Sequence, residues 1–345
     1  MNPEILTAKK LLTRIIIALI ILALVMLTCS MIGSQKLSPS QLLKKSDNPQ
    51  FTNPDRQIFF NIRIPRIILA AVVGAALACA GVVFQALLRN PLADPYILGI
   101  SSGAGLGVTI AVLSGINYTF MTMPAISLFA FIGAIATVWL VWFIAGFTGR
   151  RQVTAMLLAG VVVNAFFSAM IMFLSSIAKS QQLQSTIFWL MGNIQEQSFV
   201  ALWIIAGIVL FGICGLFLIA PQLNILSFSN RDAQTIGINP TKIQLIAFAI
   251  ASLITAIAVS ISGLIGFVGL IIPHAVRLTF GPDHRQLIPL SAIISAAFLV
   301  IADTFARTII APAQLPVGIV TAVIGGPFFL ILLVKYARKI GWYSK

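Results

Sequence analysis

Apolar runs long enough to cross a lipid bilayer as a helix recur throughout this chain of 345 residues. One crossing takes about 20 mostly apolar residues. Hydrophobic residues make up 59% of the chain and charged residues only 9%, whereas soluble domains average about 25% charged residues. The chain is therefore predicted to be an all-α polytopic membrane protein. This composition excludes a soluble enzyme, a disordered protein and a secreted domain.

Dividing the apolar residues by the length of one crossing predicts about ten transmembrane helices. Turn residues and charges separate as many segments, which cover residues 15–32, 64–88, 96–116, 123–147, 153–177, 199–220, 243–262, 264–280, 287–309 and 317–334. The longest polar stretches, 35–61 and 221–242, are too short for a second domain. Residues 1–345 are therefore predicted to form one transmembrane domain.

The net charge of +14 arises from 22 Lys and Arg residues against 8 Asp and Glu residues. Lys and Arg collect in the cytoplasmic loops of membrane proteins. With the N-terminus inside, 13 basic residues fall in cytoplasmic segments and 8 fall outside, while Arg277 is left unassigned. This bias predicts a multi-pass protein of the cytoplasmic (inner) membrane with both termini in the cytoplasm. The aromatic residues lie mostly in the apolar runs, so no nucleic-acid partner is expected.

Candidate metal ligands and nucleophiles are few. The three cysteines lie far apart without a Cys-x-x-Cys pattern, so neither a zinc site nor a disulfide framework is indicated. Of the two histidines, His284 lies between Asp283 and Arg285 in a segment expected to be solvated. A Walker A loop requires a Gly-Lys dipeptide, and the sequence contains none. The chain is therefore predicted to bind no metal or other cofactor and not to be an enzyme.

An internal correspondence joins two parts of the chain at a constant offset of 182 residues, in which Gly81, Pro91 and Gly99 recur as Gly263, Pro273 and Gly281. An odd number of predicted crossings separates the two copies, so they would run in opposite directions. Inverted repeats with Gly/Pro-interrupted segments commonly build transport pathways. The pattern predicts an internal inverted repeat, with Gly81, Gly263 and Pro273 along the pathway.

Charged residues flank two of the predicted helices at their outer ends. Arg63 and Arg66 are one helical turn apart and so share a face, and Asp303 and Arg307 are spaced i,i+4. One interpretation is interfacial snorkelling with a local ion pair. The other is a basic outer surface for an acidic partner, and spacing alone leaves both open.

The polar stretch 221–242 contains the string Arg-Asp-Ala-Gln-Thr-Ile-Gly-Ile at 231–238. This string predicts a short helix that stops near Gly237, with Pro240 beyond it. A simple connector is one interpretation. The other is a functional segment or one ordered by a partner, because loops of about 20 residues in a compact bundle are more often functional.

Several motifs follow one another along the chain. They are Arg-Ile-Pro-Arg at 63–66, Asn-Pro-Leu-Ala-Asp-Pro at 90–95, Trp-Leu-Met-Gly at 189–192, Gly-Phe-Val-Gly-Leu-Ile-Ile-Pro-His at 266–274, Asp-His-Arg at 283–285 and Pro-Val-Gly at 316–318. In this order they span nearly the whole chain. With them the chain resembles the permease subunit of type II ABC importers, the FecCD-like family that takes up iron–siderophores, haem and cobalamin.

The resemblance implies ten helices per subunit and a homodimer, or a pair with a second permease subunit, embedded in membrane lipid. Two separate ATPase subunits would bind the cytoplasmic face and use ATP. A periplasmic or lipid-anchored binding protein would deliver the substrate. Its glutamates would form salt bridges with the arginines at Arg63, Arg66 and Arg307, which would also account for the positive charge outside.

The resemblance further assigns the loop 226–238 to coupling helices in the ATPase cleft. Asn230 and Ile236 stand where the family usually has Gly and Leu, so contacts at these two positions are in doubt. Val153 and Thr154 resemble the cytoplasmic gate region, and Asn164 is a further pathway candidate. The candidate coupling residues are Arg231, Asp232, Ala233, Gly237 and Ile238.

Taken together, these features predict a permease that moves a ferric siderophore or similar metal chelate by alternating access. Haem and cobalamin are alternative substrates, because permeases for them share these motifs. A secondary transporter driven by an ion gradient is the alternative from another class. It would need intramembrane carboxylates or histidines, and the acidic residues here lie at or near segment ends.

Overall fold

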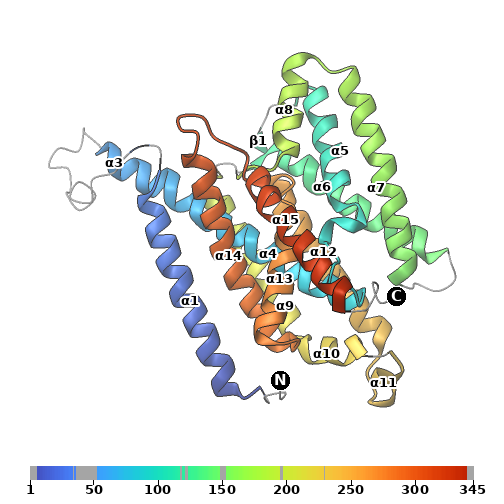
Figure 1. The fold of residues 1–345 in the computed structure, drawn as a ribbon. Coiled ribbons are helices and arrows are strands. Elements are labelled where there is room, and N and C mark those ends of the chain that lie inside the picture. The colour runs from blue at the N-terminus through green and yellow to red at the C-terminus, as the bar shows by residue number, and fades with distance from the viewer. Residues whose placement is uncertain are drawn as a thin grey trace.

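The computed structural model of the chain describes residues 6–33, 35, 53–116, 119–120, 123–147, 153–194, 197–228 and 230–339. These residues are almost wholly helical (Figure 1). The first half contains α1 (Ala8–Met31), α3 (Pro54–Gln57), the π-helix η1 (Ile58–Arg63), α4 (Ile64–Leu87), the 3₁₀ helix η2 (Pro95–Leu98), α5 (Ile100–Leu113), the short antiparallel strands β1 (Thr119–Phe120) and β2 (Met123–Pro124), α6 (Ala125–Gly146) and α7 (Val153–Ser176). The second half contains α8 (Ser180–Leu190), α9 (Phe199–Leu218), α10 (Ala220–Phe228), α11 (Asn230–Thr235), α12 (Pro240–Ser262), α13 (Val268–Phe280), α14 (His284–Thr308) and α15 (Val317–Lys339).

Each of the ten predicted segments corresponds to a helix, which confirms the all-α prediction. Within the described residues, seven helices are long and apolar enough to cross a membrane, while α5, α13 and the stretch Val317–Ile331 of α15 are shorter apolar segments. The helix in the predicted crossing 264–280 is shorter than expected, because the backbone turns before it begins. Gly263, with φ 65°, ends α12, and Phe267, with φ 68°, precedes α13, so the residues between them are not helical.

The helix α8 was not predicted, because residues 178–198 contain many polar residues and fall between the predicted segments 153–177 and 199–220. It folds back beside α5 (Figure 1). The side-chain amide of Gln182 donates to the carbonyl oxygens of Val112 and Leu113, both at 3.2 Å. These bonds satisfy carbonyl groups at the C-terminus of α5, where a helix leaves its last carbonyls unpaired.

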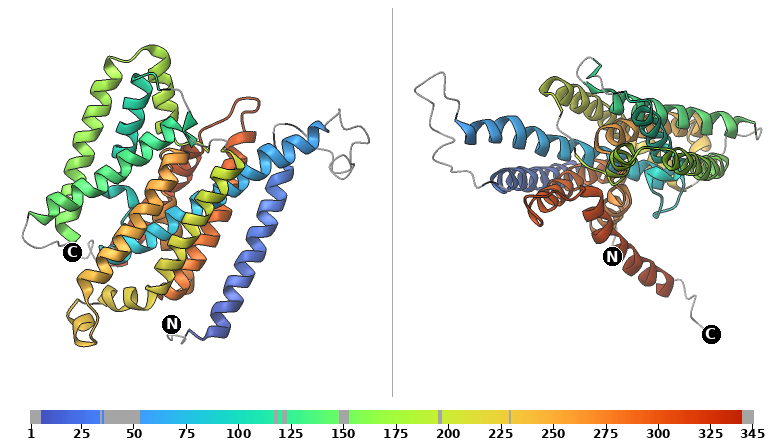
Figure 2. Two further views of the ribbon diagram at one scale, coloured as in Figure 1. Left: turned by 180° about the vertical axis from the view of Figure 1, so that it is seen from behind. Right: turned by 90° about the horizontal axis from the view of Figure 1, so that it is seen from above.

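The centre of the bundle is α4, which contacts α9, α12, α13 and α14. Its sequence from Ala75 to Gly81 is rich in Ala and Gly, and small residues allow helix backbones to approach closely within a membrane. By contrast, α1 lies at the outer edge beside α14 and is exposed along most of its length (Figures 1 and 2).

The closest backbone approach in this core joins α4 and α13. A methyl group placed on Gly81 would lie 1.8 Å from the carbonyl oxygen of Gly269, and one on Gly269 would lie 2.8 Å from that of Leu77. Only glycine therefore fits at Gly81 without moving one helix away from the other. The contact with Gly269 is enough to explain why residue 81 is a glycine. A role for Gly81 on a transport pathway stays a prediction.

Replacing Gly81 with alanine should force α4 and α13 apart and lower the free energy of unfolding by about 1–3 kcal/mol, the usual cost of overpacking. The matched control is Gly207→Ala in α9, where no atom lies within 4 Å of the new methyl group. That variant should be neutral or gain up to about 1 kcal/mol from helix propensity. Thermal unfolding in detergent compares them, and equal stability of the two variants would contradict the contact.

The offset of 182 residues pairs glycines that lie in different local structures, and the internal inverted repeat stays a prediction. Gly81 lies within α4, whereas Gly263 ends α12. Gly99 precedes α5, whereas Gly281 ends α13. Glycine suits both helix interiors in close contact and helix ends with positive φ, so its recurrence in a Gly-rich chain does not define a structural repeat.

The bundle has two distinct ends. One end carries the N-terminus of α1 together with α10 and α11, and the opposite end carries η1 and α8 (Figures 1 and 2). We refer to them as the α10 end and the η1 end. Assignment of the α10 end to the cytoplasm stays a prediction, as does the cytoplasmic location of both termini.

Candidate functional site

At the η1 end a buried carboxylate holds two arginines. Asp303, on α14, is 1% exposed. The guanidinium of Arg66 donates to it through Nε, at 3.2 Å from both oxygens, and through Nη2 at 3.0 Å. Arg307 approaches the second oxygen as an ion pair, with Nε 3.0 Å away. We call Arg66, Asp303 and Arg307 the ion cluster, and it joins α4 to α14.

The third predicted docking arginine has a different set of partners. Arg63 is the last residue of η1, and its Nη1 donates to the carbonyl oxygens of Ser30 at 3.0 Å and Met31 at 3.1 Å. Its Nη2 donates to the carbonyl of Gln35. A cation at this place satisfies carbonyls that the end of α1 leaves unpaired and complements the helix dipole.

The burial of these arginines corrects the prediction of a basic outer surface. Arg63, Arg66 and Arg307 do gather at one end, but they are only 4%, 8% and 8% exposed. Arg63 faces α1 and Arg66 faces α14, so the single shared face expected from their spacing is wrong. The local ion pair between Asp303 and Arg307 is confirmed. Docking of a partner on these residues stays a prediction.

At the α10 end the stretch 221–242 forms two short helices, α10 and α11. The predicted stop is confirmed: Gly237 has φ 83°, and its N–H donates to Gln234 while that of Ile238 donates to Ala233. Ala233 is buried and Ile236 is 66% exposed. Arg231 and Asp232 lie in α11, and their side chains are outside the described part.

Two side-chain anchors tie α10 to the rest of the bundle. Asn224 donates from Nδ2 to Asp283 at 2.8 Å, and its Oδ1 accepts from the backbone N–H of His284 at 2.8 Å and lies 2.7 Å from its ring Nδ1. Arg89, just beyond α4, donates from Nε and Nη2 to the carbonyl of Leu226 at 3.2 and 3.0 Å. These bonds join α10 to the ends of α4 and α14.

The carboxylate that anchors α10 to α14, Asp283, is ionised and partly exposed. Burial alone would raise the pKa of Asp283, but hydrogen bonds from Arg285 and Asn224 lower the pKa to about 2. His284 is 4% exposed, so its expected solvated position is wrong. The reason is its contact with Asn224, which lies 60 residues away in the sequence.

The remaining pathway candidates are not gathered into one site. Val153 and Thr154 begin α7, with side chains outside the described part. Asn164 lies further along α7, where its backbone faces Gly99. Pro273 lies inside α13. Among the described residues, no group of three or more His, Cys, Asp or Glu side chains could hold a metal ion.

The sequence was compared with models of known protein families. Residues 16–335 match the model of the FecCD transport family. The chain belongs to the FecCD transport family. It is therefore the permease subunit of an ABC importer and not an enzyme, because ATP hydrolysis lies in a separate subunit.

Individual relatives of this FecCD permease agree with the family match. The chain is 38% identical to the hemin transport system permease protein HmuU of Yersinia pestis, covering 82% of this chain and 84% of the relative. It is 42% identical to the cobalamin import system permease protein BtuC of Halobacterium salinarum, covering 82% and 76%. A solved transporter described as metal-chelate type, in an inward-facing conformation, matches with a TM-score of 0.80 and 31% identity, covering 93% of this chain and 98% of that one.

Sequence reasoning missed the anchors of this FecCD permease. Neither Arg89 nor Asn224 was singled out, because the acceptor for Arg89 is a backbone carbonyl and Asn224 lies in an ordinary polar stretch. The Asp-His-Arg motif at 283–285 was a usable signal, since it marked the residues that Asn224 contacts.

Proposed function

We propose that this permease imports a ferric siderophore or a similar metal chelate, with ATPase subunits at the α10 end and a substrate-binding protein at the η1 end. The observation that carries the proposal is the match, over nearly the whole chain, to a transporter described as metal-chelate type. Relatives named for hemin, cobalamin and iron uptake support the same class of substrate. A siderophore is the substrate we propose, with haem and cobalamin as the alternatives.

In this mechanism the permease carries out no covalent step. ATP binding by the partner subunits displaces α10 and α11, where Ile236 is exposed and Gly237 has open space beside it. The anchors from Asn224 and Arg89 pass the displacement to α14 and α4. Alternating access then requires two bundle arrangements of similar energy, biased by the nucleotide.

A second permease subunit, most simply another copy of this chain, completes the proposed importer. The helix α7 supports this arrangement, because its apolar side chains are largely exposed. Val161, Val162, Phe166 and Phe173 are all more than half exposed. Exposed apolar area within a bilayer is available to another helix or to lipid.

The proposed docking of the binding protein uses the positive charge that the η1 end retains. The ion cluster carries two arginines and one carboxylate, and Arg63 adds a third arginine. These four residues therefore carry a net positive charge although the guanidinium groups are buried. Acidic side chains of a binding protein would be attracted to this end and would compete for the guanidinium groups.

Neutralising Arg63 as Arg63→Gln should weaken association of the binding protein by about 3- to 10-fold at low salt and much less at about 0.5 M salt, because salt screens the attraction. Glutamine keeps a donor for the carbonyls of α1. Surface plasmon resonance with reconstituted permease measures the affinity, and thermal unfolding checks that the variant is folded. An unchanged affinity in a folded variant would show that Arg63 only holds the end of α1 and takes no part in docking.

A secondary transporter is less consistent with the described residues. Asp303 lies in the last two turns of α14, near the helix end as the sequence predicts. A carboxylate used for ion coupling has to exchange its cation during transport. Asp303 instead pairs with the side chains of Arg66 and Arg307, which are part of the same chain and cannot be exchanged for a transported cation.

The substrate can be tested with the cognate binding protein and the assembled importer in proteoliposomes. Ferric siderophore, haem and cobalamin are offered separately, and ATP-dependent accumulation is measured for each. Accumulation of the siderophore alone supports the proposal. Accumulation of haem or cobalamin but not siderophore would replace the substrate while leaving the importer class intact.

A further inference from the structure

The helix α15 is supported by the bundle over only part of its length. It packs mainly on α13 and α14. Val317 and Thr321, in its first two turns, are buried, and so is Gly325. Beyond Gly325 no described side chain of α15 is buried, and Leu330 is more than half exposed. Seen from above, this part of α15 leaves the bundle (Figure 2).

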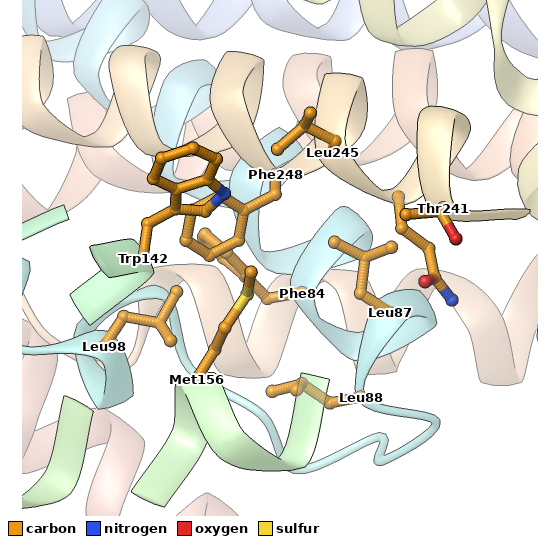
Figure 3. Close-up of a pocket in the computed structure, with 10 residues that line it drawn as sticks. Phe84, Leu87, Leu88, Leu98, Trp142, Met156, Thr241, Leu245 and Phe248 are labelled. Atoms are coloured by element: carbon orange, nitrogen blue, oxygen red, sulfur yellow. The ribbon is translucent and has the colours of Figure 1, made fainter. Parts of the chain in front are cut away.

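A void beside a helix would be one reason for such loose packing, because interiors are otherwise close-packed. A cavity of about 50 Å³ is present in the bundle (Figure 3), but it does not adjoin α15. Its lining residues lie on or next to α4, η2, α6, α7 and α12. The reason why the support of α15 ends therefore lies in α15 itself and in its neighbours.

The sequence of α15 is weakest as a helix where its support ends. Gly325, Gly326 and Pro327 follow one another inside the helix. Glycine and proline have the lowest helix propensities, and Pro327 has no N–H to donate to the carbonyl of Val323, four residues earlier. Sharp bends in helices occur at such residues. Residues 325–327, which we call the hinge, are therefore where α15 bends most easily.

The part of α15 before the hinge rests on a strained residue. Phe267, which precedes α13, has φ 68° and ψ −24°, and a positive φ is rare for a bulky side chain. A methyl group placed on Gly325 would lie 2.5 Å from Cβ of Phe267, so this side chain packs directly against the backbone of α15. Backbone strain persists only where the surrounding contacts fix the conformation, and it is found in switch regions.

Contacts from two other elements fix the backbone that precedes Phe267. The hydroxyl of Tyr96 donates to the carbonyl of Ile265 at 3.0 Å and accepts from the N–H of the same residue at 3.1 Å. The carbonyl oxygen of Leu264 faces Gly318 of α15, where a methyl group would lie 2.9 Å from it. The first part of α15 is therefore held on a fixed segment, whereas the part beyond the hinge has no such support.

We propose that α15 works in two parts, in which residues 328–339 swing about the hinge while residues 317–325 stay packed against Phe267. In this structure the two parts form one continuous helix. In the second state the helix is bent at the hinge, and its exposed part takes another direction in the bilayer. A use of this bend in alternating access rests on the proposed function, whereas the bend itself does not.

The bend is tested with a trifluoromethyl probe on Leu330→Cys, beyond the hinge, in the full chain. Cys214→Ala removes the exposed native thiol, and the other two cysteines, Cys29 and Cys79, are buried. Fluorine NMR of the permease in nanodiscs should show two resonances in slow exchange for this probe. The same probe on Val323→Cys, an exposed position before the hinge, should show one resonance.

Substitutions at the hinge should change the ratio of the two resonances. Gly326→Ala should lower the bent population about fivefold, because alanine has the higher helix propensity. No atom lies within 4 Å of the new methyl group, so the variant should fold. Gly207→Ala in α9, also in open space, is the matched control and should leave the ratio unchanged. Phe267→Gly, which permits the positive φ without strain, should give the Val323 probe a second resonance.

Transport is measured separately, in proteoliposomes with the partner subunits. Gly326→Ala combined with Pro327→Ala should lower ATP-dependent uptake by about fivefold or more, while the ATPase subunit still co-purifies. A single resonance for the Leu330 probe, or a ratio that Gly326→Ala does not alter, would overturn the hinge. An altered ratio with normal uptake would overturn its role in transport. Absence of uptake by the parent would count against the proposed function and not against the bend, which the resonances decide.

Discussion

Replacing Asp303 with asparagine should lower the free energy of unfolding by about 3–5 kcal/mol, the usual cost of removing one partner of a buried ion pair. The variant leaves Arg66 and Arg307 buried with no carboxylate between them. Both guanidinium groups are desolvated, so water does not replace the lost partner. Unfolding followed in detergent or bicelles measures the loss.

The control is the exposed ion pair between Asp283 and Arg285. In this pair Arg285 is about half exposed, and exposed pairs contribute about 0–1 kcal/mol. Arg285→Gln should therefore have little effect on stability. Replacing Arg66, Asp303 and Arg307 together by leucine should recover most of the loss, because an apolar triad leaves no unpaired charge. A loss below about 1 kcal/mol for Asp303→Asn would show that the cluster is solvated.

Removing both anchors of α10, as Arg89→Gln with Asn224→Ala, should lower the substrate moved per ATP hydrolysed by about 2- to 30-fold. Changes along a coupling network usually alter the coupling by about 0.5–2 kcal/mol. The variant loses the bonds that Arg89 donates to Leu226 and Asn224 donates to Asp283, and the bond that Asn224 accepts from the backbone N–H of His284. Displacement of α10 by an ATPase would then no longer move α4 and α14. Transport and hydrolysis are measured together in proteoliposomes.

The same control, Arg285→Gln, removes a contact of Asp283 that does not involve α10 and should retain normal coupling. Co-purification of the ATPase shows whether the double variant still assembles. An assembled double variant with a normal ratio of transport to hydrolysis would show that α10 acts on the bundle through other contacts.

The sequence was sufficient for the features that depend on local composition. Ten apolar segments correspond to helices, because each run of apolar residues must bury its backbone polar groups in a membrane. The end of α11 near Gly237 was also predicted, because glycine is the residue best suited to a positive φ at a helix end. The motifs along the chain identified the family that the comparison then confirmed.

The contacts that join distant segments were not predictable from spacing. Arg66 and Asp303 are 237 residues apart, and their pairing depends on the packing of α4 against α14. The same packing buries arginines that were expected to be exposed. The glycines matched at an offset of 182 residues lie in different local structures, because recurrence of a residue type does not determine its role.

The most direct test of the central claim, an ATP-driven importer, is uptake in proteoliposomes that contain the permease with or without its partners. We expect a ferric siderophore to accumulate only when the ATPase subunits, the binding protein and ATP are all present. A proton or sodium gradient applied to the permease alone should produce no accumulation. Accumulation driven by such a gradient in the absence of the ATPase and the binding protein would contradict the account.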